Sequence, residues 1–309
     1  MPALGPDAPH GFFDPGLAPA VSVESGGTVR LRTLESGWST EPFDVGDLGS
    51  RRRHPAWTED AGHALTGPVE VRGARAGQVL EVRVDAVVPG SWGTTFANAR
   101  PSVYNDAYGL TGTDPTVVHR WALDPVARTG RNQYGHTVAL RPFLGVIGMP
   151  PAEPGRHSTV PPRRHGGNLD CRELVAGSTL WLPIPVDGAL LSVGDGHAAQ
   201  GDGEVSGTAI ECPMDRVDLT LTVREAGDVP VTGPVASTPA GWVTMGLGDT
   251  LDEAAYEALN AMFDLIVRLH GVSRAHAVAL ASVAVDLRVT QLVNQVVGAH
   301  AVLAPGAIR

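Results

Sequence analysis

The chain has 309 residues, of which 43% are hydrophobic and 18% are charged, and its formal net charge is −10. This is the composition of a folded globular protein with a sizeable core, and the acidic balance argues against nucleic acid and anionic membranes as partners. Because every one of the 23 Lys and Arg residues is an arginine, catalysis by a lysine amine is excluded.

The first half of the chain is predicted to be rich in β-strands, because glycine and proline are frequent and because polar and apolar residues alternate in short runs. Residues 1–18 are predicted to form an N-terminal arm, and residues 19–150 a β-rich domain. Within this domain we expect two strands in 20–33, a hairpin over 69–88, loops over 90–135 and one strand over 137–148. Residues 150–164 carry five prolines, which is typical of a linker or a rigid crossing segment.

Residues 151–309 are predicted to form a second, motif-bearing region that is β-rich and ends in helices. Strands are expected over 179–186, 204–211 and 217–224, and helices over 251–270, 273–284 and 290–297, with a last strand over 300–303. Thr250 and Glu253 form a capping box before the first helix, and Gly271 is placed to end it. The predicted fold class is therefore mainly β, sandwich-like or barrel-like, with an α+β C-terminal part.

Two features of the sequence indicate a cytoplasmic protein. The first twenty residues lack the basic start and apolar core of a signal peptide, and no stretch approaches the ~18–20 apolar residues that span a bilayer. Cys171 and Cys212 are too few for a disulfide framework or a cysteine-rich zinc site. We expect both cysteines to be small buried hydrophobic residues, with a cysteine nucleophile as the minor alternative.

Residues that can bind metals are concentrated between positions 165 and 211, where they are interleaved with glycine. The sequence HGGNLD (165–170) is followed by GDGHAAQGDGE (194–204) and then by Glu211. Glycine lets the backbone turn sharply, so carboxylates and imidazoles on such turns can converge on a metal ion or polarise a water. The alternative is that these residues are structural turns with solvated acids.

Familiar catalytic motifs are absent from this segment. It contains no HExxH zinc motif, no GxSxG nucleophile elbow and no EF-hand loop. The lack of lysine also excludes serine–lysine and Glu–Lys–Cys sites. Hydrolysis by a metal-activated water is the most economical chemistry that remains.

The run from His165 to Glu211 closely resembles the acetamidase/formamidase family, whose signature it matches as GGNLD followed by GDGHAAQGDGE. Further similar segments are PAVSVESGGTV (19–29), HALTGPVEVRGARAGQVL (63–80), PFLGVIG (142–148) and residues 251–305. The resemblance covers roughly residues 10–305. The chain departs from the family at Gln78, where an acid is usual, and at Cys171, where an aliphatic residue is commoner.

This resemblance implies an amidase that converts short non-peptide amides such as formamide or acetamide into a carboxylic acid and ammonia. It also implies a homo-oligomer, in keeping with other members of the family. It also implies a divalent metal ion, with zinc favoured and calcium, manganese or magnesium as alternatives. By position, the expected metal ligands or their supports are Asp170, Asp195 and His197, and His63 is a further candidate ligand.

Amide hydrolysis also needs proton transfer and stabilisation of an oxyanion. The candidates for proton transfer are Glu204, Glu211 and His165. The candidate substrate-binding groups are the backbone N–H groups of Gly166 and Gly167 and the side chains of Asn168 and Gln200. Two other functions remain open, namely hydrolysis of another C–N bond such as that of a lactam, and a non-catalytic β-domain that binds a metal or small ligand.

Overall fold

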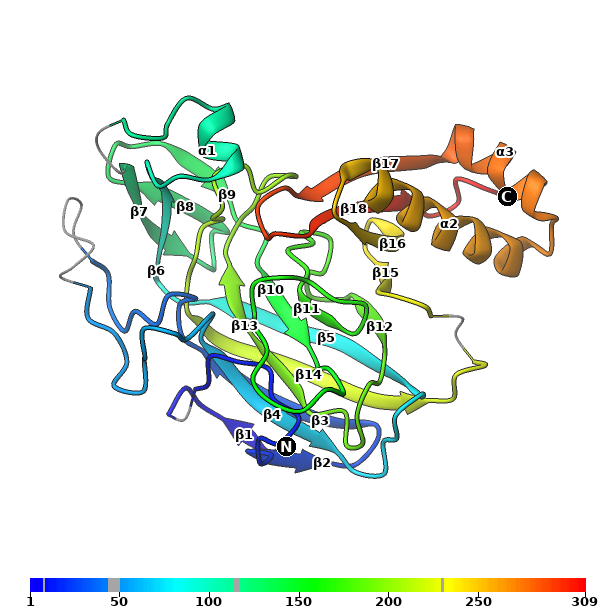
Figure 1. Ribbon diagram of the computed structural model, residues 1–309, viewed down its shortest axis with the longest axis horizontal. Coiled ribbons are helices and arrows are strands. Elements are labelled where there is room, and N and C mark those ends of the chain that lie inside the picture. The colour runs from blue at the N-terminus through cyan, green and yellow to red at the C-terminus, as the bar shows by residue number, and fades with distance from the viewer. Residues whose placement is uncertain (8, 44–50, 114–116, 229–230) are drawn as a thin grey trace.

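The computed structural model describes residues 1–7, 9–43, 51–113, 117–228 and 231–309. The strands of these residues form three open sheets of nine, five and four strands, and the few helices lie mostly near the C-terminus (Figure 1). The prediction of a mainly β fold with an α+β C-terminal part is therefore confirmed.

The nine-stranded sheet joins the N-terminal strand β1 to the C-terminal strands β17 and β18. Its strands, in spatial order, are β1 (Ala3–Leu4), β3 (Gly27–Thr33), β14 (Met214–Arg224), β5 (Val79–Pro89), β12 (Thr179–Pro183), β15 (Val235–Thr238), β16 (Gly241–Gly248), β18 (Val297–Leu303) and β17 (Val285–Gln291). In β5, Val82 and Val84 are fully buried whereas Arg83 and Asp85 are exposed. This alternation gives the sheet one apolar face.

The five-stranded sheet packs against that apolar face and carries the signature residues. Its strands, in spatial order, are β11 (Gly166–Asn168), β10 (Phe143–Gly148), β13 (Leu191–His197), β4 (Leu65–Val71) and β2 (Val21–Val23). Every residue of β10 and β13 is buried. Leu144 and Val193 of this sheet share one hydrophobic core with Leu80 and Val82 of the larger sheet, so the two form a sandwich.

A four-stranded sheet occupies the segment that we expected to be loops. It contains β6 (Trp92–Ala97), β7 (Val117–Asp124), β8 (Thr129–Asn132) and β9 (Thr137–Ala139), with the short helix α1 (Val103–Ala107) between β6 and β7. The loop prediction for 90–135 is thus wrong. Gly93 and Gly130 lie inside strands, where neighbouring atoms would leave little room for a Cβ.

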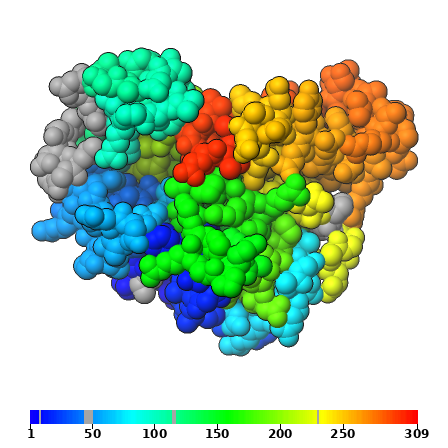
Figure 2. Space-filling model, viewed as in Figure 1, coloured from blue at the N-terminus to red at the C-terminus, as the bar shows by residue number. Residues whose placement is uncertain are grey.

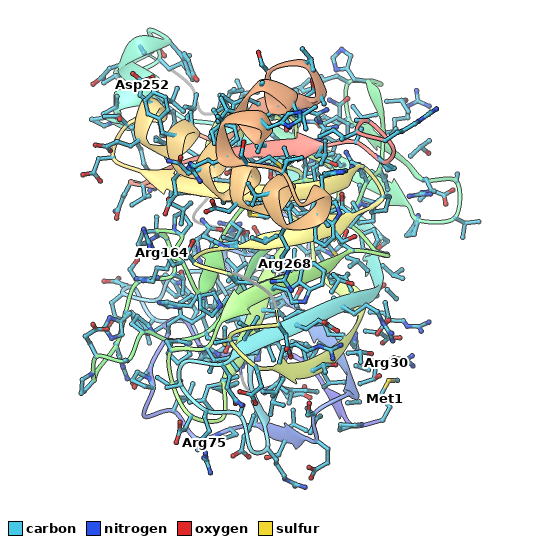
Figure 3. The ribbon with its side chains drawn as sticks, turned by 90° about the vertical axis from the view of Figure 1, so that its right-hand side faces the viewer. Met1, Arg30, Arg75, Arg164, Asp252 and Arg268 are labelled. Atoms are coloured by element: carbon cyan, nitrogen blue, oxygen red, sulfur yellow. The ribbon has the colours of Figure 1, made fainter. Side chains whose placement is uncertain are left out.

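The C-terminal helix α2 (Leu251–His270) packs beside β16 and β18, and α3 (Arg274–Ala284) packs against α2 and β17. The predicted capping box of Thr250 and Glu253 is present, and Gly271 ends α2 with a left-handed φ of 64°. Figure 3 labels Asp252 and Arg268, which mark the two ends of α2.

Three predicted elements have a different structure. Residues 290–297 form the end of β17, a turn and the start of β18 rather than a helix. The buried side chain of Gln291 stabilises this turn by accepting hydrogen bonds from the backbone N–H groups of Val293 and Asn294. Residues 204–211 are turns rather than a strand, since Glu204 and Gly207 adopt positive φ. Residues 69–88 are not a hairpin, because β4 and β5 belong to different sheets.

The predicted strand over 137–148 is divided into β9 and β10, with Pro142 in the connection. The expected domain boundary near residue 150 falls between β10 and β11, which are paired neighbours in one sheet. Strand β14 from the second half of the chain also lies between β3 and β5 from the first half. Among the described helices, none has the length and hydrophobicity needed to cross a bilayer.

Candidate metal centre

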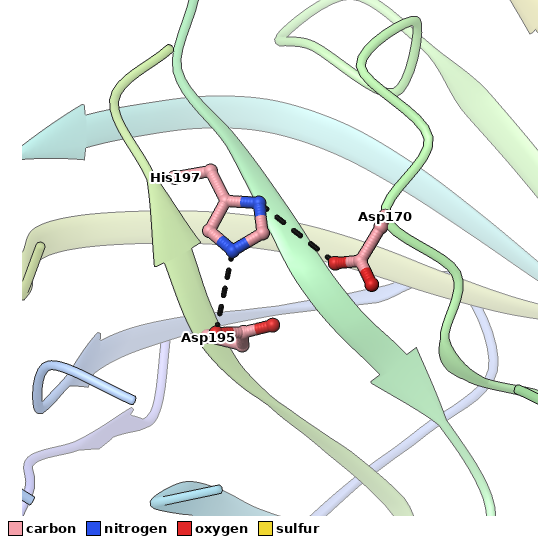
Figure 4. A group of neighbouring side chains, drawn as sticks. All are labelled: Asp170, Asp195 and His197. Carbon is pink, nitrogen blue, oxygen red and sulfur yellow. Dashed lines mark ion pairs between the residues drawn. The ribbon is translucent and has the colours of Figure 1, made fainter. Parts of the chain in front are cut away.

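Four ionisable side chains meet at the end of strand β13. His197 Nε2 lies 3.3 Å from Asp195 Oδ1 and 3.2 Å from Glu211 Oε2, while its Nδ1 lies 3.8 Å from Asp170 Oδ1. Figure 4 shows the imidazole between Asp170 and Asp195. All four side chains are buried. Because buried charges are paired or coordinate metals, this cluster is a candidate metal centre.

Strand β10 leaves a space beside the cluster. Its register with β13 pairs Leu144 with Gly196 and Val146 with Gly194, which places Gly145 alongside Asp195. A Cβ built on Gly145 would lie 2.4 Å from Asp195 Oδ2 and 2.6 Å from Asp170 Oδ1. Only glycine fits this position, because any side chain would occupy the space between the carboxylates.

The backbone of three site acids is held in the left-handed region. Asp170, Asp195 and Glu204 have φ values of 48°, 54° and 45°. This conformation costs an L-residue other than glycine roughly 1–2 kcal/mol. Such strain concentrates at functional sites, where the surrounding structure enforces it. Here it turns all three carboxylates toward the same interior space.

The cluster contains buried polar atoms that have no hydrogen-bond partner. These are Asp170 Oδ1, His197 Nε2 and Glu204 Oε2. The other ring nitrogen of His197, Nδ1, is 2.9 Å from Gln200 Oε1, and Gln200 Nε2 donates to the Asp170 carbonyl at 2.8 Å. Since an amide oxygen only accepts, Nδ1 carries a proton, which leaves Nε2 as the ring atom that faces the carboxylates and could bind a cation.

These donors fit a divalent metal ion. Asp170, Asp195 and His197 bring one ligand atom each within 4.8 Å of one another, and His197, Glu204 and Glu211 form a second such group. A mixed set of carboxylate oxygens and an imidazole nitrogen suits zinc and other first-row divalent ions.

The pKa values of the cluster reflect burial and crowding of acids. Burial and the neighbouring charge of Asp195 raise the pKa of Asp170 to about 6. Burial, opposed by His197, raises the pKa of Glu211 to about 7, and burial together with Asp170 holds the pKa of Glu204 well above its usual value. Burial opposes ionisation of His197 and Asp195 too. The negative charges of Glu211 and Asp195 nevertheless raise the pKa of the imidazole, and His197 lowers the pKa of the Asp195 carboxyl.

A cavity of about 250 Å³ opens onto the cluster. Its lining residues include His63, Phe96, Val160, Asn168, Asp195, Glu204, Glu211 and Asn294. Glu211 is held at the wall of this cavity, because Ser36 Oγ donates to its Oε2 at 3.0 Å and the Ala209 N–H donates to its Oε1 at 2.9 Å.

The remaining predicted site residues lie at different distances from this centre. His63 lines the cavity but belongs to neither ligand group, and its Nδ1 contacts Thr159 Oγ1 at 2.8 Å. His165 is absent from the cavity lining, and its Nδ1 lies 2.8 Å from the Met149 carbonyl. Gln200 contacts His197 rather than the cavity.

The signature glycines are engaged by the backbone. The Gly166 N–H donates to the Arg163 carbonyl at 3.0 Å, and Gly167 pairs with Ile147 in the sheet. A Cβ on Gly166 would lie 2.2 Å from the Ile147 carbonyl oxygen, so glycine there allows β11 to approach β10 closely. Asn168 follows on β11, and its side chain lines the cavity.

Sequence reasoning did not identify several residues of the site. Gly145 lies within the family-like segment PFLGVIG, so the sequence marks its position but not its place beside the carboxylates. No sequence pattern marks Ser36 and Asn294, because their contacts with Glu211 and Asp170 join positions 175 and 124 residues apart.

Neither cysteine faces the cavity. Both side chains are fully buried, and burial raises the pKa of the Cys171 thiol to about 12 and that of Cys212 well above its usual value. Since the thiolate is the reactive form, this environment does not suit a nucleophile.

The sequence model of the Acetamidase/Formamidase family matches residues 5–158 and 152–308. The chain belongs to this family. An acetamidase from Mycolicibacterium smegmatis is 31% identical over 327 residues, covering 82% of this chain and 77% of that protein. A formamidase from Methylophilus methylotrophus is 26% identical over 246 residues, covering 64% of this chain and 59% of that protein, so the match spans less than two thirds of its length.

A solved family structure has the same fold. The crystal structure of an acetamidase from Bacillus halodurans superposes with a TM-score of 0.86 at 29% identity, covering 98% of this chain and 97% of that chain. The three-sheet arrangement is therefore that of a family acetamidase along nearly its whole length.

Proposed function

We propose that this family member hydrolyses short amides, of the formamide and acetamide type, to a carboxylic acid and ammonia at the buried cluster. The observation that carries the proposal is the set of unpartnered atoms of Asp170, His197 and Glu204 beside a small cavity. The names of the related acetamidase and formamidase agree with this chemistry.

In this proposal Asp170, Asp195 and His197 hold a divalent ion, with zinc favoured because an imidazole nitrogen joins the carboxylates. Such an ion, when bound, lowers the pKa of water to about 7 and polarises a carbonyl oxygen. Gln200 fixes the imidazole through Nδ1, which leaves Nε2 for the ion.

Glu211 is the proposed general base. Its two oxygens accept hydrogen bonds from Ser36 and Ala209, which favour the carboxylate form. Burial nevertheless keeps its pKa near 7, close to the value at which a base works best at neutral pH. Glu211 would take a proton from the attacking water as the water oxygen bonds to the amide carbon.

Glu204 is the proposed general acid. Its Oε2 has no partner, and burial and Asp170 keep its pKa well above the usual range, so this carboxyl holds a proton. Transfer of that proton to the amide nitrogen lets the C–N bond break and ammonia leave. Two carboxyls whose environments separate their pKa values suit this division of acid and base.

The cavity wall supports selection of a small amide. Asn168 Nδ2 donates to the Val160 carbonyl at 3.1 Å, and its buried Oδ1 has no partner. This oxygen is suited to accept an N–H of the substrate. The volume of about 250 Å³ lies just below the range of about 300–1,000 Å³ typical of drug-sized ligands.

The cellular setting is also a proposal. Cys171 and Cys212 are both free thiols, which agrees with a reducing compartment such as the cytoplasm. The resemblance to the family supports a homo-oligomer, and sedimentation of the purified protein measures the number of subunits.

The deciding experiment combines metal analysis with ammonia release. The purified protein is assayed with formamide, acetamide, a longer primary amide and a bicyclic lactam, before and after chelation and after re-addition of zinc, manganese, calcium or magnesium. We expect turnover of a short linear amide that is lost on chelation and restored by one ion.

Matched variants connect this activity to the cluster. Glu211→Gln is expected to lower kcat by about 10²–10⁴-fold. Asp202→Asn is the control, because Asp202 belongs to the same signature but is one-third exposed and lies outside both ligand groups. Background ammonia release with every ion would favour a non-catalytic binding domain, and turnover of the lactam alone would favour a lactamase.

A further inference from the structure

The turn between β17 and β18 reaches the metal centre from the far end of the chain. Asn294, in this turn, donates a hydrogen bond from Nδ2 to Asp170 Oδ2 and lines the same cavity. Figure 1 shows the turn in red, extending from the C-terminal strands toward β10 and β11, and Figure 2 shows red atoms resting on the green body. The C-terminal part therefore contributes a polar contact to a site whose other residues come from the sandwich.

The turn that presents Asn294 is held from inside. Gln291 is fully buried, and its Oε1 accepts hydrogen bonds from the backbone N–H groups of Val293 and Asn294 at 2.9 and 3.1 Å. Its Nε2 donates to the Val296 carbonyl at 2.7 Å. Gly203, in the signature loop, pairs with the backbone on both sides of Gln291. These contacts fix the position of the Asn294 side chain before any ligand arrives.

The hydrogen bond divides the two oxygens of Asp170 between different tasks. Oδ2 is satisfied by Asn294, whereas Oδ1 is buried without a partner and faces His197 Nδ1 at 3.8 Å. Rotation of the carboxylate about χ2 would break the bond to Asn294. We propose that Asn294 is a positioning residue, which holds Asp170 so that Oδ1 is presented to the cation.

This inference rests on the proposed function insofar as the cluster takes up a divalent ion. It goes further in assigning part of the affinity for that ion to the C-terminal turn. Contacts that orient a metal ligand from outside its first shell typically contribute 10–100-fold to metal affinity.

The test measures zinc affinity directly, by competition with a chromophoric chelator, in the full-length protein. Asn294→Leu keeps the approximate volume of the side chain and removes the donor. Asn294→Ala removes the donor and most of the side chain. Neither variant adds charge beside the cation. Val293→Ala changes the neighbouring residue of the same turn and serves as the control.

We expect the zinc Kd to rise 10–100-fold in both Asn294→Ala and Asn294→Leu, with Val293→Ala within twofold of the wild type. The melting temperature of each metal-free variant is recorded alongside, because a purely structural role would lower it without changing the Kd. Zinc affinity within twofold of the wild type in both Asn294 variants would overturn the inference.

The outcome separates this inference from the proposed function. If the wild-type protein binds zinc and releases no ammonia from any amide, while Asn294→Ala still weakens binding, the function is wrong and the positioning role stands. If the wild-type amidase is metal-dependent and the variants bind zinc normally, only the positioning role falls.

Discussion

Gly145→Ala tests whether the space between the carboxylates is what the site requires. The added Cβ would lie 2.4 Å from Asp195 Oδ2, 2.6 Å from Asp170 Oδ1 and 2.8 Å from His197 Cε1, whereas ordinary contact begins at 3.4 Å. The two carboxylate oxygens would have to move by 1.0 and 0.8 Å, the differences between 3.4 Å and these distances. All three neighbours are buried side chains in a packed interior, so none can move freely.

A displacement of about 1 Å at a catalytic centre can lower the rate about 10²-fold. Overpacking of this kind also costs about 1–3 kcal/mol of folding stability. We therefore expect Gly145→Ala to fold with a lowered melting temperature, to bind less metal, and to have a kcat/KM for acetamide about 10²-fold below the wild type. Ammonia release and elemental analysis on the same samples measure the last two quantities.

Gly201→Ala is the matched control for this prediction. Gly201 lies in the signature loop, its φ is not in the left-handed region, and a Cβ there would meet nothing within 4 Å. The control should keep wild-type kinetics and metal content. A Gly145→Ala protein with full metal content and a kcat/KM within threefold of the wild type would refute the reasoning.

Three further predictions follow from the fold. Thr250→Ala removes the cap of α2 and should lower the free energy of unfolding by about 1 kcal/mol in denaturant titrations, with unchanged kcat/KM. Cys171 and Cys212 should resist a thiol reagent in the native protein and react in denaturant, and Cys171→Ala should stay active; rapid native labelling that abolishes activity would contradict this. In metal-free protein, the raised pKa of Glu211 means that the folded state keeps a proton that the unfolded state releases. The free energy of unfolding should therefore fall as the pH rises from 5 to 8. This fall should be up to about 3 kcal/mol larger in the wild type than in Glu211→Gln. Parallel melting curves of these two proteins check the sign.

The sequence predicts elements well where local physics decides them. Thr250, Glu253 and Gly271 set the ends of α2 through contacts within a few residues, so the helix has the predicted bounds. Residues 204–211 show the opposite case. They were predicted to form a strand, but Glu204 adopts a left-handed backbone and its side chain is buried in the cluster, among residues that are distant in the sequence.

The same distinction applies to the site. Asp195 and His197 occupy one strand, and their spacing of two residues places both side chains on one face, so their proximity follows from the sequence once β13 is assigned. Ser36 and Asn294 reach Glu211 and Asp170 only because distant segments pack together. A single sequence does not indicate which distant segments pack together in the fold.

The surplus of acidic side chains in the interior favours binding of a cation at the cluster. Four carboxylates, from Asp170, Asp195, Glu204 and Glu211, share one buried space with the imidazole of His197, and His63 lines the adjoining cavity. Two imidazolium groups could not neutralise four carboxylates, and burial of unpaired charge is costly. In the absence of a metal the balance must be met by protons, which is why three of the four acids have raised pKa values. A divalent ion would neutralise the carboxylates in place of these protons, while leaving Glu211 free to exchange its proton. The buried surplus of carboxylates, which makes the interior unfavourable for charge, would therefore also make it reactive toward an amide.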